Sequence, residues 1–545
     1  MAFLKRQADW LASILLIGAA LLYAAYFVNF NVPPFEDAAM LVRYSDHLAH
    51  GYGIVWNIGE HPVDGATDFL FMVTSAGLIK FGIAVGRSVR SIAFGSHLLT
   101  VLLVYWANRK IWKANIPISF LSGLYLGVGT GFSYVAAFFG TPFFALFAGL
   151  TWILSNLLIQ KQTPPFWLSL LFAFSALLTG LSRPEGVVLS IGMLISIIIL
   201  KGWGASLKTI TAFAVVFLFL GGAYFLWHWN YFGFPLPNPF YKKGGGGLYW
   251  DSFWESIGNL LRFGGPFMLA FLLGFRSREK ARRTVAYLIP LILFASAFIL
   301  ISNETNFGGR FQYALWPLIL LSWYPLFDGL TLDLGFSWQH PIKVRNRAIL
   351  ILTGSALAFG ALFYSSSQNC VLTAAQSTCA VAYEADGRYD AAKMLSNFQG
   401  KGYVIATSEA GLLPFYSNWK AVDTWGLNDE WIAHHGEITE GYLDQYKPNL
   451  IVFHAYFSPL VPPRLIEKNL AQNWFRMTIT LKEYAEKHGY ILAAAFGDSP
   501  YETHYYYVRP DFEDSKTIVH EISTMKNYYW FSTGSKSINY ADYQP

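Results

Sequence analysis

The sequence predicts an α-helical membrane protein that crosses the bilayer about eleven times and carries an α/β domain at its C-terminal end. Composition is the first observation, since 54% of the 545 residues are hydrophobic and 13% are charged, with a mean hydropathy of +0.35. A soluble protein would carry roughly twice that share of charged residues. The second observation is that the apolar residues form runs of about 20, the length that crosses a bilayer core. The third is a change after Tyr364, where the hydrophobic runs shorten to the length of strands.

The first apolar run follows Lys5 and Arg6, and it lacks the small-residue cleavage site that a signal peptide needs. We therefore expect this run to be retained as the first span. The expected spans are Trp10–Phe30, Ser91–Asn108, Ile116–Ala136, Phe143–Ile159, Phe166–Leu181, Val187–Leu200, Ile210–Trp229, Leu260–Phe275, Val285–Ile301, Phe311–Phe327 and Ala348–Tyr364.

The run Phe69–Val85 is also apolar enough to span, but it lies between a polar stretch and the basic residues Arg87 and Arg90. If this run does not cross, the basic clusters between the other runs all face the cytoplasm, as the positive-inside rule requires. If it crosses, every later cluster faces outward. We therefore expect Phe69–Val85 to form a juxtamembrane helix on the outer side, with a cytoplasmic N-terminus and the chemistry on the extracytoplasmic face.

This topology predicts a transmembrane domain over residues 1–365, with outer juxtamembrane helices over residues 33–90, and an extracytoplasmic α/β domain over residues 366–545. In the second domain, strand-length runs alternate with amphipathic helical stretches. The strand-length runs are residues 403–407, 450–457, 490–496 and 503–510. The two cysteines, Cys370 and Cys379, precede these strands. Outside the cytoplasm they could form a disulfide, with two free thiols or a metal pair as the alternatives.

The charge of the chain argues against nucleic acid as a partner. The net charge of +5 is small for a chain of this length, and the basic residues lie in short clusters between apolar runs. Such clusters are typical of topology signals rather than of a nucleic-acid surface. We expect membrane lipid, and no nucleic acid, among the partners.

The polar stretch Pro33–Phe69 holds two neighbouring carboxylates, Glu36 and Asp37. Its beginning predicts an interfacial amphipathic helix that starts after two prolines and has Glu36, Arg43 and His47 on its polar side. Carboxylates beside a membrane must be solvated, paired or used. The alternative is a connector helix whose acids only complement the helix dipole.

Several other outer segments carry cations and amides suited to an anion. Asn238, Lys242 and Lys243 precede four glycines, which allow a backbone to approach a ligand closely; the alternative is a surface loop. Arg310 lies where a span begins and could hold an anion or only extend to the interface. Arg183 belongs to an Arg-Pro-Glu-Gly turn, where a structural ion pair at a helix start is the favoured interpretation.

Five stretches, in the same order along the chain, resemble the bacterial GT-C membrane glycosyltransferases, in particular those similar to the mycobacterial terminal arabinofuranosyltransferase. The stretches are Phe35–Leu70, Thr179–Leu189, Tyr231–Lys243, Asn306–Pro317 and Gly411–Ala433. The resemblance implies a transferase that takes a sugar from a polyprenyl-phosphate donor, with arabinofuranose as the suggested sugar. It also implies an acceptor that is a cell-envelope glycan, a lipid-linked glycan or a protein, on the outer face of a bacterial cytoplasmic membrane.

The resemblance also implies site residues. The family usually has an aspartate pair in its first loop, where this chain has Glu36 and Asp37, so Asp37 is the safer match. Thr141 stands in a turn where the family often has an acidic residue, and no second catalytic carboxylate is therefore assigned. Asp37, assisted or replaced by Glu36, would accept the proton of the acceptor hydroxyl. Arg310, with Lys242 or Lys243, would neutralise the departing phosphate.

Four further residues are candidates for positioning the substrates: His61, Arg43, Asn238 and Arg183. For His61, a solvated turn histidine is the alternative. No metal site is assigned, although Glu36, Asp37 and a phosphate could together hold Mg²⁺ or Ca²⁺.

Two other functions remain as alternatives. A transporter or flippase of a lipid-linked sugar would have ionisable residues in the middle of the membrane and repeated, interrupted helices. The charges here lie at the ends of the spans instead, and no internal repeat is evident. A non-catalytic envelope scaffold would keep the fold without needing Asp37, Arg310 and Lys242.

Overall fold

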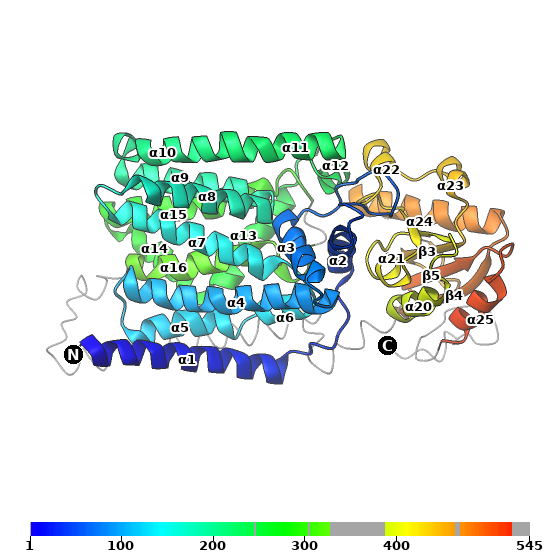
Figure 1. Ribbon diagram of the computed structural model, residues 1–545, viewed down its shortest axis with the longest axis horizontal. Coiled ribbons are helices and arrows are strands. Elements are labelled where there is room, and N and C mark those ends of the chain that lie inside the picture. The colour runs from blue at the N-terminus through cyan, green and yellow to red at the C-terminus, as the bar shows by residue number, and fades with distance from the viewer. Residues whose placement is uncertain (1, 245–246, 303–305, 328–386, 464–468, 526–545) are drawn as a thin grey trace.

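The computed structural model describes residues 2–244, 247–302, 306–327, 387–463 and 469–525 (Figure 1). Long helices lie side by side along the longest axis of the molecule, and a small sheet domain covers one end of this bundle (Figure 1). The predicted fold class, an α-helical polytopic membrane protein with a C-terminal α/β domain, is confirmed.

Within the described residues, six helices are long and apolar enough to cross a membrane. They are Gln7–Phe27, Val85–Lys110, Ile116–Ala136, Thr141–Gln160, Trp203–Phe232 and Trp250–Arg276. Four further predicted spans coincide with helices that are shorter or more charged, namely α8 (Phe166–Ser182), α9 (Glu185–Lys201), α15 (Arg278–Ala297) and α16 (Trp316–Phe327). The predicted span Ala348–Tyr364, Cys370 and Cys379, and the boundary at residue 365 lie outside the described residues, so the count of spans and the domain boundary stay predictions.

The bundle consists of helices that pack through one large hydrophobic core. Their bounds are α1 (Ala2–Phe27), α4 (Val85–Lys110), α5 (Ile116–Gly127), α6 (Gly131–Ala136), α7 (Thr141–Gln160), α8 (Phe166–Ser182), α9 (Glu185–Lys201), α10 (Trp203–Val216), α11 (Gly222–Phe232), α13 (Trp250–Gly264), α14 (Leu269–Leu273), α15 (Arg278–Ala297) and α16 (Trp316–Phe327). A π-helical turn, Phe217–Gly221, joins α10 to α11, and the 3-10 turns Gly265–Met268 and Gly274–Arg276 flank α14. Two more 3-10 turns, Phe307–Gly309 and Gln312–Leu315, precede α16.

Three shorter helices lie between the bundle and the sheet domain: α2 (Glu36–Ala49), α3 (Phe69–Lys80) and α12 (Asn238–Gly244) (Figure 1). Helix α3 has 12 residues, so it extends for about 18 Å and is too short to cross a bilayer core of about 30 Å. The expectation that Phe69–Val85 does not span stays a prediction.

The amphipathic helix was predicted at the correct place, but the burial of its polar side was not predicted. Arg43 and His47, expected on a polar outer side, are both buried. The reason is that the sheet domain covers this side of α2, where the backbone carbonyls of Pro414 and Trp419 accept hydrogen bonds from Arg43. Helix α2 therefore lies between two packed parts of the protein rather than on an open membrane surface.

The C-terminal domain is built on a five-stranded sheet with the strand order β2-β1-β3-β5-β4. The strands are β1 (Val404–Thr407), β2 (Lys420–Asp423), β3 (Leu450–Ala455), β4 (Ile491–Ser499) and β5 (Glu502–Val508). Strand β1 is parallel to β2 and β3, whereas β5 is antiparallel to β3 and β4. Four of these strands were predicted, and β2 was missed because it has four residues and begins with an exposed lysine.

Helices cover both faces of the sheet. Alternate residues of β3 point to opposite faces, so Ile451 and Phe453 pack against α24 (Asn469–Lys487), while Leu450 and Val452 face the other side. Helices α22 (Glu430–His435) and α23 (Glu440–Tyr446) lie on the α24 side. Helices α20 (Arg388–Leu395), α21 (Leu412–Ser417) and α25 (Ser515–Ser523) lie on the opposite side.

Candidate active site

The candidate site begins at the first turn of α2. Phe35 precedes the helix in an extended conformation, and its backbone N–H donates to the carbonyl of Ala137 at 3.1 Å, which fixes where the helix starts. Successive residues of a helix point about 100° apart. The carboxylates of Glu36 and Asp37, neighbours in the sequence, therefore point in different directions and meet different partners.

Asp37 forms an ion pair with Arg310. Arg310 follows Gly308 and Gly309, which both have positive φ, and this turn directs the arginine side chain toward α2. Its guanidinium lies 4.3 Å from the ring centre of Phe139, and the side chain is 6% exposed. Burial opposes the charged form of Asp37, but the positive charges of Arg310 and Lys243 prevail and hold the pKa of the Asp37 carboxyl below its usual value.

Arg310 retains unused hydrogen-bonding capacity. Among the described residues, neither its Nε nor its Nη1 has an acceptor, although both atoms are buried. A buried guanidinium N–H without an acceptor is costly, and oxygen atoms of an anion are its natural partners. The side chain is therefore suited to an anionic ligand in addition to Asp37.

Asp37 and Arg310 line a cavity of about 300 Å³. Lys243 of α12 lines it as well; burial is the main cause that lowers the pKa of this lysine, and the nearby charges of Arg310 and Arg183 lower it further, against the opposing effect of Asp37. A negatively charged ligand in this cavity would therefore be attracted by Arg310, Lys243 and Arg183 together. The apolar part of the lining includes Phe138, Phe139, Val188, Leu236, Phe240, Phe298, Leu300, Ile301 and Phe311.

Arg183 contributes to the same cavity in a network of ion pairs. Its Nη1 lies 2.9 Å from Asp68 Oδ1, and its Nη2 lies 3.1 Å from Glu185 Oε1. The ion pair expected within the Arg-Pro-Glu-Gly turn is therefore present. Its arginine also faces the cavity, so the structural and ligand-binding interpretations are compatible.

Sequence reasoning missed Asp68, a second carboxylate that lines the cavity. Burial raises the pKa of its carboxyl, in spite of the opposing charge of Arg183. The signal that could have found it is its position, since Asp68 is the last polar residue before the apolar run that forms α3. Asp68 approaches the turn of Thr141, where no second catalytic carboxylate was assigned: a Cβ added to Gly140 would lie 2.8 Å from Asp68 Oδ2.

Three predicted site residues bind the sheet domain instead of lining this cavity. Glu36 accepts hydrogen bonds from the backbone N–H groups of Gly411 and Leu412, and it pairs with Arg388 at 3.2 Å. Lys242 donates to the carbonyl of Gly436 and lies over the ring of Trp425 at 4.4 Å.

Arg43, the third of these residues, donates to the carbonyls of Trp56, Pro414 and Trp419. Burial lowers its pKa to about 10, and nearby acidic groups oppose that shift. Arg43 therefore joins the first loop to the sheet domain.

The last two predicted residues do not line this cavity either. Asn238 is buried, its backbone N–H donates to the carbonyl of Asp64 at 2.9 Å, and it starts α12, which carries Lys243. His61 is 67% exposed and lines a second cavity of about 390 Å³ together with aromatic residues that include Trp431 and Tyr442.

A divalent cation between Glu36 and Asp37 does not fit this arrangement. Asp37 pairs with Arg310, while both oxygens of Glu36 are engaged by the amides of residues 411–412 and by Arg388. The two carboxylates thus do not face a common position at which Mg²⁺ or Ca²⁺ could contact both of them.

The chain is similar to one described protein family and to several solved structures. The profile of a family described as a domain of unknown function, DUF8728, matches residues 379–509. No curated protein matches the chain. Similar solved structures are ArnT from Cupriavidus metallidurans bound to undecaprenyl phosphate and the same protein in the apo state. The lipid-bound structure has 11% identity and a TM-score of 0.56, and the match covers 90% of this chain and 97% of ArnT. The apo structure has 13% identity and a TM-score of 0.53, and the match covers 92% of this chain and 98% of ArnT.

A third similar structure is the archaeal oligosaccharyltransferase AglB from Archaeoglobus fulgidus, in complex with an inhibitory peptide and a dolichol-phosphate. It has 11% identity and a TM-score of 0.50, over 82% of this chain and 69% of AglB. At these identities the likeness concerns the fold, and the chain has the GT-C fold that ArnT and AglB share. The resemblance to the mycobacterial arabinofuranosyltransferase is not tested by these structures.

Proposed function

We propose that this protein is a membrane glycosyltransferase that moves a sugar from a polyprenyl-phosphate donor to a hydroxyl of a cell-envelope acceptor. The observation that carries the proposal is Arg310, which is buried beside Asp37 in a cavity and has two N–H groups without an acceptor among the described residues. The lipid phosphates in the similar structures of ArnT and AglB support the same class of donor.

The donor would bind with its charged and apolar ends in different parts of the cavity. Its phosphate oxygens accept hydrogen bonds from Arg310 and lie near the ammonium group of Lys243. Its isoprenoid chain packs on the apolar lining that includes Phe240, Phe298 and Ile301. A lipid with an anionic head therefore matches both halves of the cavity.

The transfer itself breaks the bond between the anomeric carbon and the phosphate oxygen and forms a bond from that carbon to the acceptor oxygen. The transition state has oxocarbenium character, and the polyprenyl phosphate leaves with the bonding electron pair. Arg310 and Lys243 stabilise the negative charge that develops on this leaving group. No proton is needed by the phosphate, so the remaining task is to remove the proton of the acceptor hydroxyl.

Asp37 accepts that proton. Its low pKa keeps it ionised before the donor binds. When the donor phosphate takes up the charge of Arg310, the guanidinium stabilises the Asp37 carboxylate less, and the pKa of Asp37 rises toward its usual value. Donor binding thus makes Asp37 a better base when the acceptor is in place, and general base catalysis of this kind is worth about 10²–10⁴-fold in rate.

For the finer assignments, we propose arabinofuranose as the sugar and the outer face of a bacterial cytoplasmic membrane as the location. We also propose the division into residues 1–365 and 366–545. These assignments rest on the resemblance of five sequence stretches and on the distribution of basic residues. The acceptor is a glycan, a lipid-linked glycan or a protein.

Sugar transfer by the purified full-length protein in detergent tests the proposal. Polyprenyl-phosphate arabinose and polyprenyl-phosphate hexoses serve as donors, and release of polyprenyl phosphate is measured. We expect Asp37→Asn to lower the rate by about 10²–10⁴-fold while the protein still binds the donor. The matched control is Asp46→Asn on the same helix, whose carboxylate lies 3.3 Å from His50 and does not line the cavity.

Other outcomes favour the other functions. A wild-type protein that binds the donor and never consumes any of these sugars is a transporter or a scaffold, and sugar-lipid movement across vesicles separates those two. Activity that survives in Asp37→Asn would retain the transferase but remove Asp37 from its chemistry.

A further inference from the structure

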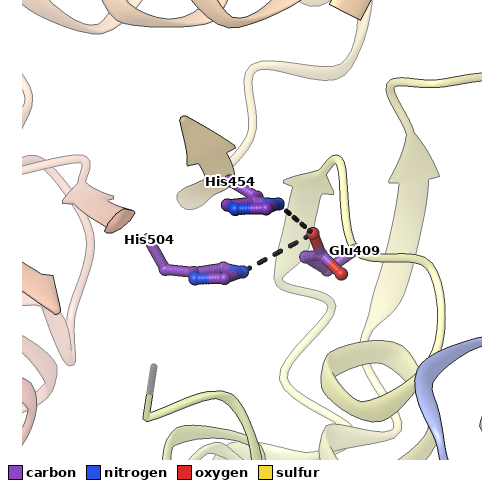
Figure 2. A group of neighbouring side chains, drawn as sticks. All are labelled: Glu409, His454 and His504. Carbon is purple, nitrogen blue, oxygen red and sulfur yellow. Dashed lines mark ion pairs between the residues drawn. The ribbon is translucent and has the colours of Figure 1, made fainter. Parts of the chain in front are cut away.

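A second cluster of reactive side chains lies in the sheet domain, where Glu409, His454 and His504 converge (Figure 2). His454 belongs to β3, His504 belongs to β5, and Glu409 follows the end of β1. Each of the three side chains offers one ligand atom, and these atoms all lie within 4.8 Å of one another. None of the three is used by the proposed transfer reaction.

The sheet register places the two histidines together. His454 and His504 are direct partners in the antiparallel pairing of β3 with β5, so their side chains leave the same face of the sheet. Their rings are stacked (Figure 2), and the ring centres lie 4.6 Å apart with an angle of 4° between the ring planes. The strand register therefore brings both imidazoles to one place on this face of the sheet. Because the last side-chain torsion of histidine has a broad range, each ring can turn a nitrogen toward a shared ion.

The distances in the cluster suit metal ligands better than hydrogen bonds. Glu409 Oε1 lies 3.8 Å from His454 Nδ1 and 3.5 Å from His504 Nε2. Hydrogen bonds between nitrogen and oxygen measure about 2.7–3.2 Å. Ligand atoms at bonds of about 2 Å around a tetrahedral ion stand about 3.3 Å apart, which is close to the observed separations.

A fourth side chain orients one of the ligands. His454 Nε2 lies 3.0 Å from the carboxylate of Glu502, so this ring nitrogen donates its proton there. In the neutral imidazole, Nδ1 is then unprotonated and points its lone pair at Glu409 Oε1, another acceptor. Two facing acceptors are favourable when a cation lies between them, and a carboxylate behind a metal-binding histidine is a common arrangement.

The surrounding charge is also suited to a divalent cation. Arg388 pairs with the other oxygen of Glu409, Oε2, and with Glu36 of α2. Around the cluster, Glu36, Glu409 and Glu502 bring three negative charges and Arg388 brings one positive charge, which leaves two negative charges. Glu409 Oε1 remains directed toward the histidines while Arg388 holds Oε2.

We propose that Glu409, His454 and His504 bind a divalent transition metal of the zinc type, with Glu502 as the residue that orients His454. The metal completes a chain of contacts that runs from the sheet domain through Arg388 to Glu36, next to Asp37 in α2. It thereby fastens the sheet domain to the helix that carries the candidate base. Water supplies the remaining coordination position, since Glu502 beside the site is 61% exposed.

Cobalt binding to the purified full-length protein in detergent tests this site. Co²⁺ reports its coordination through visible d–d absorption, and bound metal is counted by mass spectrometry after removal of excess ion. We expect about one Co²⁺ per chain with the spectrum of a four-coordinate site, displaced by Zn²⁺. The variant His504→Gln loses this spectrum, whereas His520→Gln, an exposed histidine of α25 in the same domain, keeps it.

Glu502→Gln provides a second measurement that does not depend on altering the buried cluster, because this side chain is largely exposed. It lowers the affinity for Co²⁺ by about 10–100-fold through His454. The proposal is overturned if the wild type binds no Co²⁺ or Zn²⁺, or if the folded His504→Gln variant retains the spectrum. It is also overturned if Glu502→Gln leaves the affinity unchanged while His504→Gln fails to fold. A failed metal test leaves the transferase proposal intact, since the proposed transfer uses Asp37 and Arg310 and no group of this cluster.

Discussion

Arg310 is the residue on which the candidate site depends most. One of its nitrogens pairs with Asp37, and its Nε and Nη1 have no acceptor among the described residues. The planar guanidinium is held over Phe139 and Phe311 at 4.3 and 5.0 Å. A ligand with several acceptor oxygens in one plane can therefore engage nitrogens that Asp37 leaves unused.

We accordingly predict that Arg310→Lys binds polyprenyl phosphate at least about tenfold more weakly than the wild type does. Lysine keeps the positive charge but replaces the fork of N–H donors by a single ammonium, and one hydrogen bond to a charged group is worth about 1.5–3 kcal/mol. Binding of the sugar-free lipid phosphate by the detergent-solubilised protein is the measurement.

Arg476→Lys is the matched control, because this arginine is 51% exposed and pairs only with Glu437 among the contacts described. Equal affinity of wild type and Arg310→Lys would exclude bidentate binding of the phosphate by Arg310.

Asp429 allows a prediction about pH. Its carboxylate accepts hydrogen bonds from the backbone N–H of Ile432 and from the hydroxyl of Tyr442. Burial raises its pKa to about 6, although both hydrogen bonds oppose the shift. Below about pH 4 the carboxyl is protonated in the folded and unfolded states alike. Above about pH 6 the folded state holds a buried negative charge. The free energy of unfolding therefore falls as the pH rises from about 4 to about 6.

Asp429→Asn removes this charge and keeps the hydrogen bond at the start of α22. We expect it to raise the melting temperature above pH 6, by a stabilisation of up to about 3 kcal/mol, and to leave it unchanged below about pH 4. Thermal unfolding across this range is the measurement, with Asp511→Asn, whose side chain is 72% exposed, as the control. A pH-independent difference would show that the buried charge is not its cause.

At the scale of elements, α2 and α21 meet at an unusually close contact. A Cβ added to Gly411 would lie 1.9 Å from the backbone oxygen of Glu36, so only glycine permits this approach. The same contact lets the N–H groups of Gly411 and Leu412 reach the Glu36 carboxylate. This carboxylate therefore fixes the sheet domain to the start of α2.

We predict that Gly411→Ala separates α2 from the sheet domain, lowers the melting temperature and reduces sugar transfer, because the start of α2 also carries Asp37. The control is Gly441→Ala in α23, where an added Cβ meets nothing within 4 Å and alanine favours the helix by about 1 kcal/mol. If the two variants have equal stability, the close contact is not needed to join the two parts.

For the whole molecule, the basic residues at the end of α9 and the start of α15 lie at the end of the bundle away from the cavity. Helix α15 has Ala297 at the cavity and begins at Arg278, about 30 Å away along the helix. Helix α9 likewise begins with Glu185 at the cavity and ends at Lys201. Positive charge at this one end is the pattern that orients membrane proteins, and it predicts that this end is cytoplasmic and the sheet domain extracytoplasmic.

Cysteine labelling in intact cells measures this orientation. In a background in which Cys370 and Cys379 are replaced by serine, Glu513→Cys in the sheet domain should react with a membrane-impermeant maleimide. Glu279→Cys in the basic cluster, which is also exposed, should react only after the membrane is opened. The reverse labelling pattern would invert the topology and place the candidate site on the cytoplasmic side.

Features that depend on local patterns could be predicted from the order of residues alone. Apolar runs of a given length predicted membrane helices, and alternating short runs predicted β1, β3, β4 and β5, because helix and strand formation follow from neighbouring residues. The start of α2 was also readable, from two prolines followed by two acids.

Which side chains lie together could not be predicted, because it depends on how distant parts of the chain pack. Asp37 meets Arg310 and Glu36 meets Gly411 because the helix rotates by about 100° per residue and two distant parts of the chain pack against it. The burial of Arg43, and the convergence of Glu409, His454 and His504 from separate strands, likewise follow from packing and strand register. Such meetings join residues far apart in the sequence, where no local spacing records them.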